Sequence, residues 1–310
     1  MGRIKDLFTD SIWSIDTGKV SMVSKSYARL VTFIKLVRIT INTFTENKMG
    51  FQCVALSYFV TLAIIPLLAF IFAITGGLGL SELLDKVLLS AAAYVDPMML
   101  SLVEEKAENI IDIAQNGWVG VVAALSFLWT ILWMMFQVER VFNNVWGIQK
   151  IPRKLYKRIG YYFVILLLMP VIIVVFGLGI AYYGNLTKFM GLDLSELRIL
   201  PTLLGYLGLY IITTFTFSAM YKFIPATEVK YKNALKAAAV GAFVFVVFQY
   251  LYLETQVFVA RMNTVYGVLA AIPLFLIWLN FSWQIIIYGA ELTYSFQNIK
   301  NYGLQEVDNR

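Results

Sequence analysis

The sequence predicts an all-α membrane protein with six transmembrane helices, and three observations support this fold class. Of the 310 residues, 60% are apolar and only 14% are charged, and the mean hydropathy is +0.74. The apolar residues gather in six runs, each long enough to cross about 30 Å of hydrocarbon as a helix of roughly 20 residues. Basic residues lie mainly in alternate connections between these runs. A surface in water could not accommodate so apolar a composition, so a bilayer is the expected solvent.

The six runs define the expected spans and the domain organisation. The spans are residues 54–74, 118–137, 161–183, 202–223, 235–253 and 268–288. They lie in a membrane domain of residues 51–295, preceded by a cytoplasmic or interfacial segment (1–50) and followed by a cytoplasmic tail (296–310). Because a long charged segment precedes the first run, we expect that run to be a retained span and not a cleavable signal peptide.

Lysine and arginine residues indicate how the spans are oriented. Twenty of the 25 lie before the first span, between spans two and three, between or at the ends of spans four and five, or after the sixth span. These connections share one side of the membrane, which the positive-inside rule assigns to the cytoplasm. Both chain ends are therefore expected in the cytoplasm.

Residues 25–45, ahead of the first span, are expected to form an amphipathic helix. One helical arc carries the apolar side chains Tyr27, Leu30, Val31, Phe33, Ile34, Val37, Ile41 and Phe44, and the opposite arc carries Lys25, Arg29, Thr32 and Lys35. Such a helix either lies at the membrane surface or packs on its own bundle. The pattern fits both arrangements equally.

The first outer connection, residues 75–117, is the longest. It holds seven acidic residues against Lys86 and Lys106, and Asp96-Pro97 is placed as a helix cap and first helical position. We expect two amphipathic helices there. They form either a solvated cap over the bundle or a surface for a partner or substrate.

Three expected spans contain an interior proline, at Pro66, Pro170 and Pro273. Each proline removes an amide donor and pushes on the carbonyl group four residues earlier. A bend is therefore predicted in each of these helices, and bent helices can open a cavity in a bundle.

The residues needed for common hydrolytic chemistry are missing from the sequence. There is no histidine, and Cys53 is the only cysteine, so a zinc-dependent nuclease or protease would lack its usual ligands. No phosphate-binding glycine motif followed by Lys and Ser or Thr is present. We expect no enzymatic activity, no metal, no cofactor and no nucleic-acid partner, although a metal-free mechanism with a Lys or a carboxylate pair stays open.

Polar side chains gather at the ends of the expected spans, where ionisable groups are costly unless they are paired or wetted. On the cytoplasmic side, the predicted substrate-binding residues are Arg140, Asn143, Asn144, Lys222, Gln284 and Glu291, and Gln137, Glu139 and Tyr221 lie near them. An outer polar cluster consists of Gln249, Glu254, Arg261 and Asn263. Solvation at the membrane interface is the competing explanation for both clusters.

Arg140 and Glu291 give the sharpest hypothesis. Both lie about one turn past the last apolar residue of their spans, and Gly289-Ala290 would admit a neighbouring helix close to Glu291. We expect the two to form an ion pair or to share a substrate headgroup, because Arg binds phosphate and carboxylate with two parallel hydrogen bonds. The alternative places Arg140 among the lipid headgroups and Glu291 in water.

The fourth span carries a stripe of Tyr206, Tyr210, Thr213, Phe217 and Tyr221 at helical spacing. Its hydroxyl groups can line a pathway. They can equally provide contacts between helices.

Several of these stretches resemble a single protein family. They are Ala55-Leu56-Ser57-Tyr58-Phe59 with Pro66, Asn143-Asn144-Val145-Trp146, Tyr221-Lys222-Phe223-Ile224-Pro225 with Gly241-Ala242, and the run from Tyr266-Gly267 through Ile272-Pro273 and Trp278 to Gly289-Ala290-Glu291-Leu292. Over roughly residues 30–295 the sequence resembles the YihY and BrkB membrane proteins, once called ribonuclease BN. It has Ala239-Val240 where the family pattern shows a proline before Gly241.

The resemblance implies a six-span, multi-pass protein of the bacterial cytoplasmic (inner) membrane, in agreement with the charge distribution. It also implies transport or handling of an envelope lipid or an anionic solute, with membrane lipids as partners. A non-transporting membrane scaffold or accessory protein is the alternative. Ribonuclease activity is not expected, because the zinc chemistry of such nucleases depends on histidines that this sequence lacks.

Overall fold

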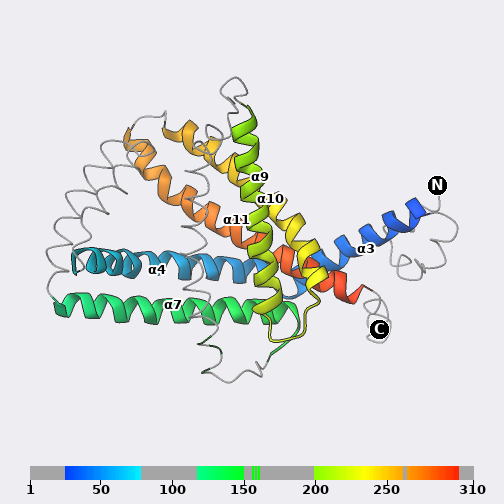
Figure 1. Cartoon of the computed structure of the whole chain (residues 1–310), viewed down its shortest axis with the longest axis horizontal. Coiled ribbons are helices and arrows are strands. Elements are labelled where there is room, and N and C mark those ends of the chain that lie inside the picture. Colours follow the sequence, from blue (N-terminus) through cyan, green and yellow to red (C-terminus); the bar gives the residue numbers. More distant parts are fainter. Residues whose placement is uncertain are drawn as a thin grey trace, which may run out of the picture. The chain divides into compact units, whose positions relative to one another are not determined.

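The structure, a computed structural model, describes residues 25–77, 117–149, 156, 158, 160, 199–260 and 264–299. The regular elements in these residues are all α-helices: α3 (Lys25–Glu46), α4 (Met49–Gly77), α7 (Gly117–Val145), α9 (Ile199–Phe223), α10 (Tyr231–Ala260) and α11 (Thr264–Asn298). Figure 1 shows them coloured along the chain. The predicted all-α class is confirmed for this part of the chain.

Five of the six expected spans fall inside these helices. Spans 54–74, 118–137, 202–223, 235–253 and 268–288 lie within α4, α7, α9, α10 and α11, in that order. Within the described residues, three stretches are long and apolar enough to cross a membrane, namely Leu125–Val145, Tyr231–Thr255 and Pro273–Asn298, and Met49–Ile64 is a shorter apolar stretch. The count of six spans and their orientation stay predictions.

Other sequence predictions concern residues outside the described ranges. These are the span at 161–183 with Pro170, the loop residues 78–116, Arg261, Asn263, and the segments before residue 25 and after residue 299. Helices α4 and α11 continue through Pro66 and Pro273. The bends expected at these prolines stay predictions.

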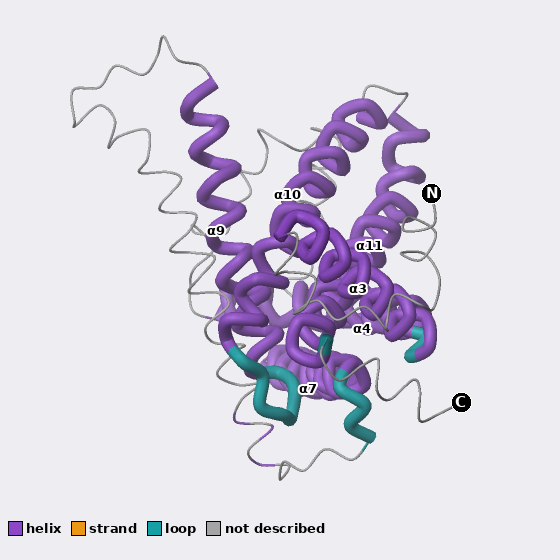
Figure 2. Tube along the Cα trace, turned by 90° about the vertical axis from the view of Figure 1, so that its right-hand side faces the viewer, coloured by secondary structure: helices purple, strands orange, loops and turns teal. Residues whose placement is uncertain are grey.

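Packing groups the chain into two compact units, Met1–Val54 with Glu139–Arg310, and Ala55–Val138. In the first unit, α10 packs along both α9 and α11, and α11 also packs on α3 and on α9. Figures 1 and 2 show α10 beside α11 from two directions. The described part of the second unit consists of α4 from Ala55 onward and α7 as far as Val138, and it exposes the large rings of Tyr58, Trp118, Trp129 and Trp133.

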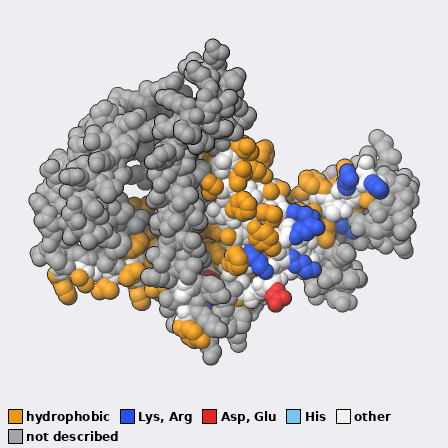
Figure 3. Space-filling model, in the orientation of Figure 1, with side chains coloured by type: hydrophobic (Ala, Val, Ile, Leu, Met, Phe, Trp, Pro, Cys, Tyr) orange, Lys and Arg blue, Asp and Glu red, His pale blue; other side chains and the backbone are white. Residues whose placement is uncertain are grey.

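Helix α10 has the surface expected of a helix with lipid on one side. Its exposed residues include Val240, Phe243, Val244, Val247 and Leu251, whereas its alanines at 234, 237, 238 and 242 are buried. In Figure 3, apolar side chains cover the visible face of α10, and Lys and Arg side chains gather where the helix begins. Lys230, Lys232 and Lys236 are exposed there. An apolar face of this extent indicates a membrane or protein contact and not water.

Helix α3 matches the predicted amphipathic helix in position, but its buried face takes residues from both predicted arcs, among them Val31 and Phe44 as well as Lys35. The buried residues include Ala28, Lys35, Ile39, Thr40 and Thr43. The apolar stripe of Leu30, Phe33, Val37 and Ile41 is exposed, with Phe33 at 66%. Thr40 on the buried face contacts Ser295 of α11, and the apolar stripe stays outside, as an interfacial helix requires. Lys35, which belongs to the predicted polar arc, is only 8% exposed.

The end of α7 is fixed by a glycine C-cap. Gly147 has a φ of +67°, a left-handed conformation that glycine adopts without steric cost. The Ile148 amide donates to the Asn143 carbonyl oxygen at 2.9 Å, and the Gly147 amide donates to that of Asn144 at 3.0 Å. This arrangement closes the helix as a Schellman-type motif and holds Asn143 and Asn144 in its last turn.

Candidate functional site

Tyr221 on α9 lies where four helices meet. Its side chain is 1% exposed, and its ring centroid is 6.3 Å from that of Phe142 on α7 and 6.0 Å from that of Phe217. A Cβ atom at Gly289 on α11 would overlap the Tyr221 hydroxyl and lie 2.7 Å from Cζ, and one at Gly241 on α10 would lie 3.2 Å from Oη. The two glycines therefore make room for the tyrosine between α10 and α11.

Three buried hydroxyl groups on α9 and α11 have no hydrogen-bond partner among the described residues. They are Ser218 Oγ, Tyr221 Oη and Ser282 Oγ. Ser218 lies three residues before Tyr221 on α9, so helical periodicity places it on the same side of α9 as Tyr221. Ser282 lies seven residues before Gly289 on the same side of α11, about two helical turns (roughly 10 Å) away along the axis. We refer to Ser218, Tyr221 and Ser282 as the hydroxyl cluster of the α9–α11 interface.

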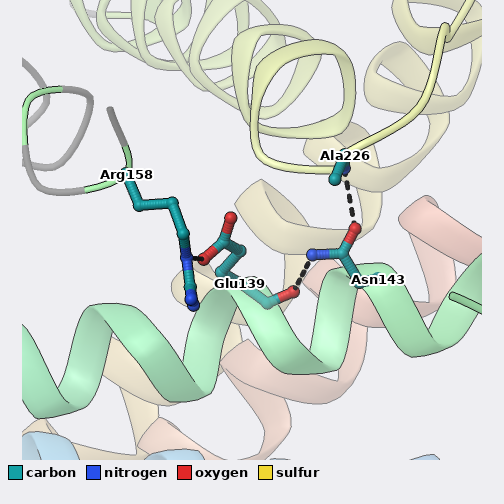
Figure 4. A network of polar contacts seen from close by, with 4 residues as sticks. All are labelled: Glu139, Asn143, Arg158 and Ala226. Carbon is teal, nitrogen blue, oxygen red and sulfur yellow. Dashed lines mark hydrogen bonds and ion pairs between the residues drawn. The ribbon is translucent and has the colours of Figure 1, made fainter. Parts of the chain in front are cut away.

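A second group of polar residues joins the end of α7 to the segments that follow α7 and α9 (Figure 4). Glu139 is 1% exposed, and Arg158 Nε donates to its Oε2 atom at 2.5 Å. Asn143 Nδ2 donates to the Glu139 carbonyl oxygen at 2.9 Å, and Asn143 Oδ1 accepts from the Ala226 amide at 2.7 Å. We call Glu139, Asn143, Arg158 and Ala226 the α7-end network.

Glu291 on α11 is fully buried and has a different environment. Neither carboxyl oxygen has a hydrogen-bond partner among the described residues. The nearest polar neighbours are Thr43 and Asn47, but the Thr43 hydroxyl donates to the Ile39 carbonyl oxygen at 2.8 Å. The Asn47 carbonyl oxygen is itself an acceptor, from Gln52 Nε2 at 2.9 Å. The side chains of Thr43 and Asn47 therefore lie close enough to act on the carboxyl group, but among the described residues neither forms a hydrogen bond with it.

The surroundings of Glu291 are formed by the packing of α3 on α11. The hydroxyls of Thr40 and Ser295 lie 2.9 Å apart, and Ser295 also donates to the Glu291 carbonyl oxygen at 2.9 Å. The rings of Phe44 and Tyr288 stack with centroids 3.8 Å apart and an interplanar angle of 6°. Glu291 thus lies in a contact made of aromatic rings and short hydroxyl side chains.

The predicted pair of Arg140 and Glu291 is not formed in the structure. Arg140 is exposed, whereas Glu291 is buried with both carboxyl oxygens unbonded. The buried ion pair at the end of α7 joins Arg158 to Glu139 instead. Consecutive helical residues point about 100° apart, so when Glu139 faces inward Arg140 faces outward.

The other predicted substrate-binding residues are placed in separate local contacts. Lys222 Nζ donates to the Val229 carbonyl oxygen, and Gln284 Nε2 donates to Asn280 Oδ1 at 2.6 Å. Asn144 Nδ2 donates to the Asn47 carbonyl oxygen at 3.4 Å. Whether these residues bind a substrate stays a prediction.

Half of the outer polar cluster lies in the described residues. Gln249 Oε1 accepts from Trp278 Nε1 at 2.8 Å and so links α10 to α11, and Glu254 is exposed near the end of α10. The tyrosine stripe of α9 faces α10 through edge-on aromatic contacts. The ring centroids of Tyr206 and Tyr250 lie 6.0 Å apart, and those of Phe217 and Phe245 lie 5.5 Å apart. These contacts favour the helix-packing interpretation of the stripe.

Three residues of these sites are not predictable from the sequence pattern. Arg158 is one of several basic residues that mark the cytoplasmic side, and no periodic signal connects it to Glu139. Ser218 and Ser282 are single hydroxyls in apolar runs. Their spacing from Tyr221 and Gly289 was the only available signal. Among the described residues, no group of three or more His, Cys, Asp or Glu converges on a metal-binding arrangement.

Comparison with known proteins identifies relatives over most of the chain. Residues 40–309 match the family model described as "Virulence factor BrkB". A UPF0761 membrane protein of Halorhodospira halophila is 28% identical over 253 residues, which cover 79% of this chain and 53% of the relative. One of Haemophilus influenzae is 26% identical over 265 residues, which cover 83% of this chain and 93% of the relative. The chain thus spans about half of the first relative and nearly all of the second. No solved structure matches it.

Proposed function

The chain belongs to the family described as virulence factor BrkB and is a multi-pass bacterial membrane protein, and we propose that it binds and moves a substrate with an anionic group. The substrate is either an envelope lipid or an anionic solute. Membership of the family supports a location in the membrane. The chemistry of the described residues is the argument for an anionic substrate.

The hydroxyl cluster of the α9–α11 interface is the observation that carries this proposal. A buried polar group without a partner costs about 1–3 kcal/mol, and nearly all such groups in proteins are paired. Ser218, Tyr221 and Ser282 are three such groups on facing helices. They are neutral donors, which can bind phosphate or carboxylate oxygens inside a bilayer without the cost of burying an uncompensated cation.

The charge distribution supports an anionic substrate. The chain has a formal net charge of +6, and Lys230, Lys232 and Lys236 are exposed at the start of α10. Positive charge at one end of a helix bundle raises the local concentration of anions and speeds their encounter with the protein. Lipids with phosphate headgroups and carboxylated solutes share this chemistry.

A membrane scaffold remains the second candidate, and the α7-end network favours it. Asn143 and Glu139 use their polar atoms to tie the end of α7 to Ala226 and Arg158. Such contacts fix helix ends and need no ligand. A scaffold would require this network but not the hydroxyl cluster, so variants of the two regions separate the two functions.

The test uses the purified chain in liposomes with a fluorescent phospholipid or a fluorescent isoprenoid-phosphate lipid, and in parallel liposomes loaded with a labelled carboxylated solute. The wild-type protein should move one of these substrates faster than protein-free liposomes do. The triple variant Ser218→Ala, Tyr221→Phe, Ser282→Ala should be slower, because each hydrogen bond of about 1 kcal/mol contributes about fivefold to binding. Tyr231→Phe removes an exposed tyrosine hydroxyl from α10 and is the matched control.

Protein-dependent movement of none of these substrates would exclude the proposed function and favour the scaffold. Movement that the triple variant leaves unchanged would exclude the hydroxyl cluster as the binding site. Binding of a lipid without movement would indicate handling in place of transport.

A further inference from the structure

Glu291 is an ionisable side chain buried beside residues of α3. It has no exposed area, and neither carboxyl oxygen has a hydrogen-bond partner among the described residues. An ionised carboxylate in such a place would lose its hydration and gain no cation or hydrogen bond in return. A protonated carboxyl is neutral, so it avoids most of that cost.

The groups that face Glu291 do not change this conclusion. The ionisable neighbours are Glu46 on α3 and Tyr294 on α11 itself, and neither carries positive charge. Asn47 and Thr43 are neutral. No cation of the described chain lies beside the carboxyl group, in contrast to Glu139, which Arg158 contacts directly.

We propose that Glu291 is a proton-binding site, which holds one proton in the conformation described here and releases it to water when the packing of α3 on α11 opens. In the release step the O–H bond breaks, the proton passes to water, and the electron pair stays on the carboxylate. Closing the helices again requires the carboxylate to take up a proton. The assignment of this proton as the coupling ion for transport rests on the proposed function, but proton binding itself does not.

The contact that must open is the packing of α3 on α11. It includes the hydroxyl–hydroxyl hydrogen bond between Thr40 and Ser295 and the aromatic stack of Phe44 on Tyr288. The opposite face of α3 is an exposed apolar stripe, which can stay in contact with lipid while the helix tilts. Movement of α3 therefore gives water access to Glu291 without unfolding the bundle.

Infrared spectroscopy of the full chain in lipid nanodiscs tests the proposal directly. The C=O stretch of a buried carboxylic acid is separate from the carboxylate bands, so the wild type should show an acid band at neutral pH that disappears as the pH is raised. Glu291→Gln should lack the band. Glu139→Gln is the matched control, because Glu139 is equally buried but paired with Arg158, and it should keep the band. A full acid band in Glu291→Gln would overturn the proposal.

A second measurement needs no variant, so it holds even if Glu291→Gln fails to fold. Dicyclohexylcarbodiimide reacts with protonated carboxyl groups in apolar surroundings, and mass spectrometry locates the product. The wild type should be labelled at Glu291 and not at Glu139, and labelling should decrease as the pH rises. Labelling at Glu139 alone, or labelling of Glu291 that sodium ions suppress and pH does not, would overturn the proposal.

Both measurements are made without substrate. A negative result in them leaves the proposed transport function intact. Conversely, a titrating Glu291 in a protein that moves no substrate leaves the proton site intact and removes only its role in coupling.

Discussion

The α7-end network and the surroundings of Glu291 bury the same side chain in opposite ways. Glu139 is 1% exposed and Glu291 is 0% exposed, yet Arg158 binds Glu139 at 2.5 Å, while Glu291 has no hydrogen-bond partner among the described residues. Burial alone therefore does not tell what a glutamate does. The presence or absence of a bonded partner distinguishes the two residues. The ion pair with Arg158 indicates a structural role for Glu139, whereas the unbonded carboxyl of Glu291 is the basis for the proposed exchangeable proton.

The largest expected effect comes from removing the partner of Glu139. Arg158→Gln leaves a buried carboxylate without its cation, which typically costs about 3–5 kcal/mol. The double variant Arg158→Gln, Glu139→Gln should lose less stability than Arg158→Gln alone, because no buried charge remains uncompensated. Thermal unfolding in detergent measures these losses. Arg140→Gln, which changes an exposed arginine of the same helix region, is the control and should change the melting temperature little.

If Arg158→Gln proves no worse than Arg140→Gln, the ion pair contributes nothing and the contrast between the two glutamates fails. Strictly additive effects of the two substitutions would lead to the same conclusion.

The next effect concerns the glycines that admit Tyr221. Gly289→Ala should destabilise the chain by about 1–3 kcal/mol or more, because the new Cβ would overlap the hydroxyl and lie 2.7 Å from Cζ of a buried ring. Gly241→Ala should cost less, since its Cβ would lie 3.2 Å from Oη. Gly50→Ala, where the nearest atom is 4.0 Å away on Phe44, is the control. Melting temperatures of the three variants should follow this order.

Tyr221→Phe sharpens this prediction, because it removes only the hydroxyl oxygen. It should rescue Gly241→Ala almost fully, since the next atom, Phe217 Cδ2, lies at 3.6 Å. It should rescue Gly289→Ala only in part, because Cζ remains in the way. Equal rescue of both variants would show that α9 and α11 lie further apart than described.

A smaller effect distinguishes the glutamates by pH. If Glu291 holds a proton as proposed, the folded state binds a proton that an unfolded, hydrated carboxyl has already lost at neutral pH, so stability should fall as the pH rises above the ordinary range of a glutamate. The slope can reach about 1.4 kcal/mol per pH unit for one proton. Glu291→Gln should remove this slope and cost little at lower pH, since it breaks no hydrogen bond present in the structure. Melting curves at several pH values measure it, and an unchanged slope in Glu291→Gln would contradict the assignment.

The sequence predicted the helices well but not their inward faces. Apolar runs are a local property, so five expected spans coincide with described helices. Lipid removes the usual rule that apolar residues point inward, and α3 buries Lys35 and Thr40 together with Val31, Leu36 and Ile39, while it exposes Phe33. The partner of Glu139 was not predictable either, because Arg158 lies 19 residues away in a segment where basic residues mark topology. Glu291 was identified as a site residue, but its neighbours on α3 depend on tertiary packing.

The smallest expected change in stability is that of Tyr221→Phe, and it contrasts with Asn143→Ala. Asn143 Oδ1 accepts from the Ala226 amide at 2.7 Å, so truncating it leaves a partly buried donor unpaired and should cost about 1–3 kcal/mol. Tyr221 Oη has no partner among the described residues, so removing it leaves nothing unpaired, and the variant should be no less stable than the wild type. The effect on substrate movement in liposomes should be the opposite of the effect on stability. The Tyr221→Phe protein should move substrate more slowly although its melting temperature does not fall. A Tyr221→Phe protein as unstable as Asn143→Ala would mean that the hydroxyl is bonded within the protein, and the hydroxyl cluster would then be structural.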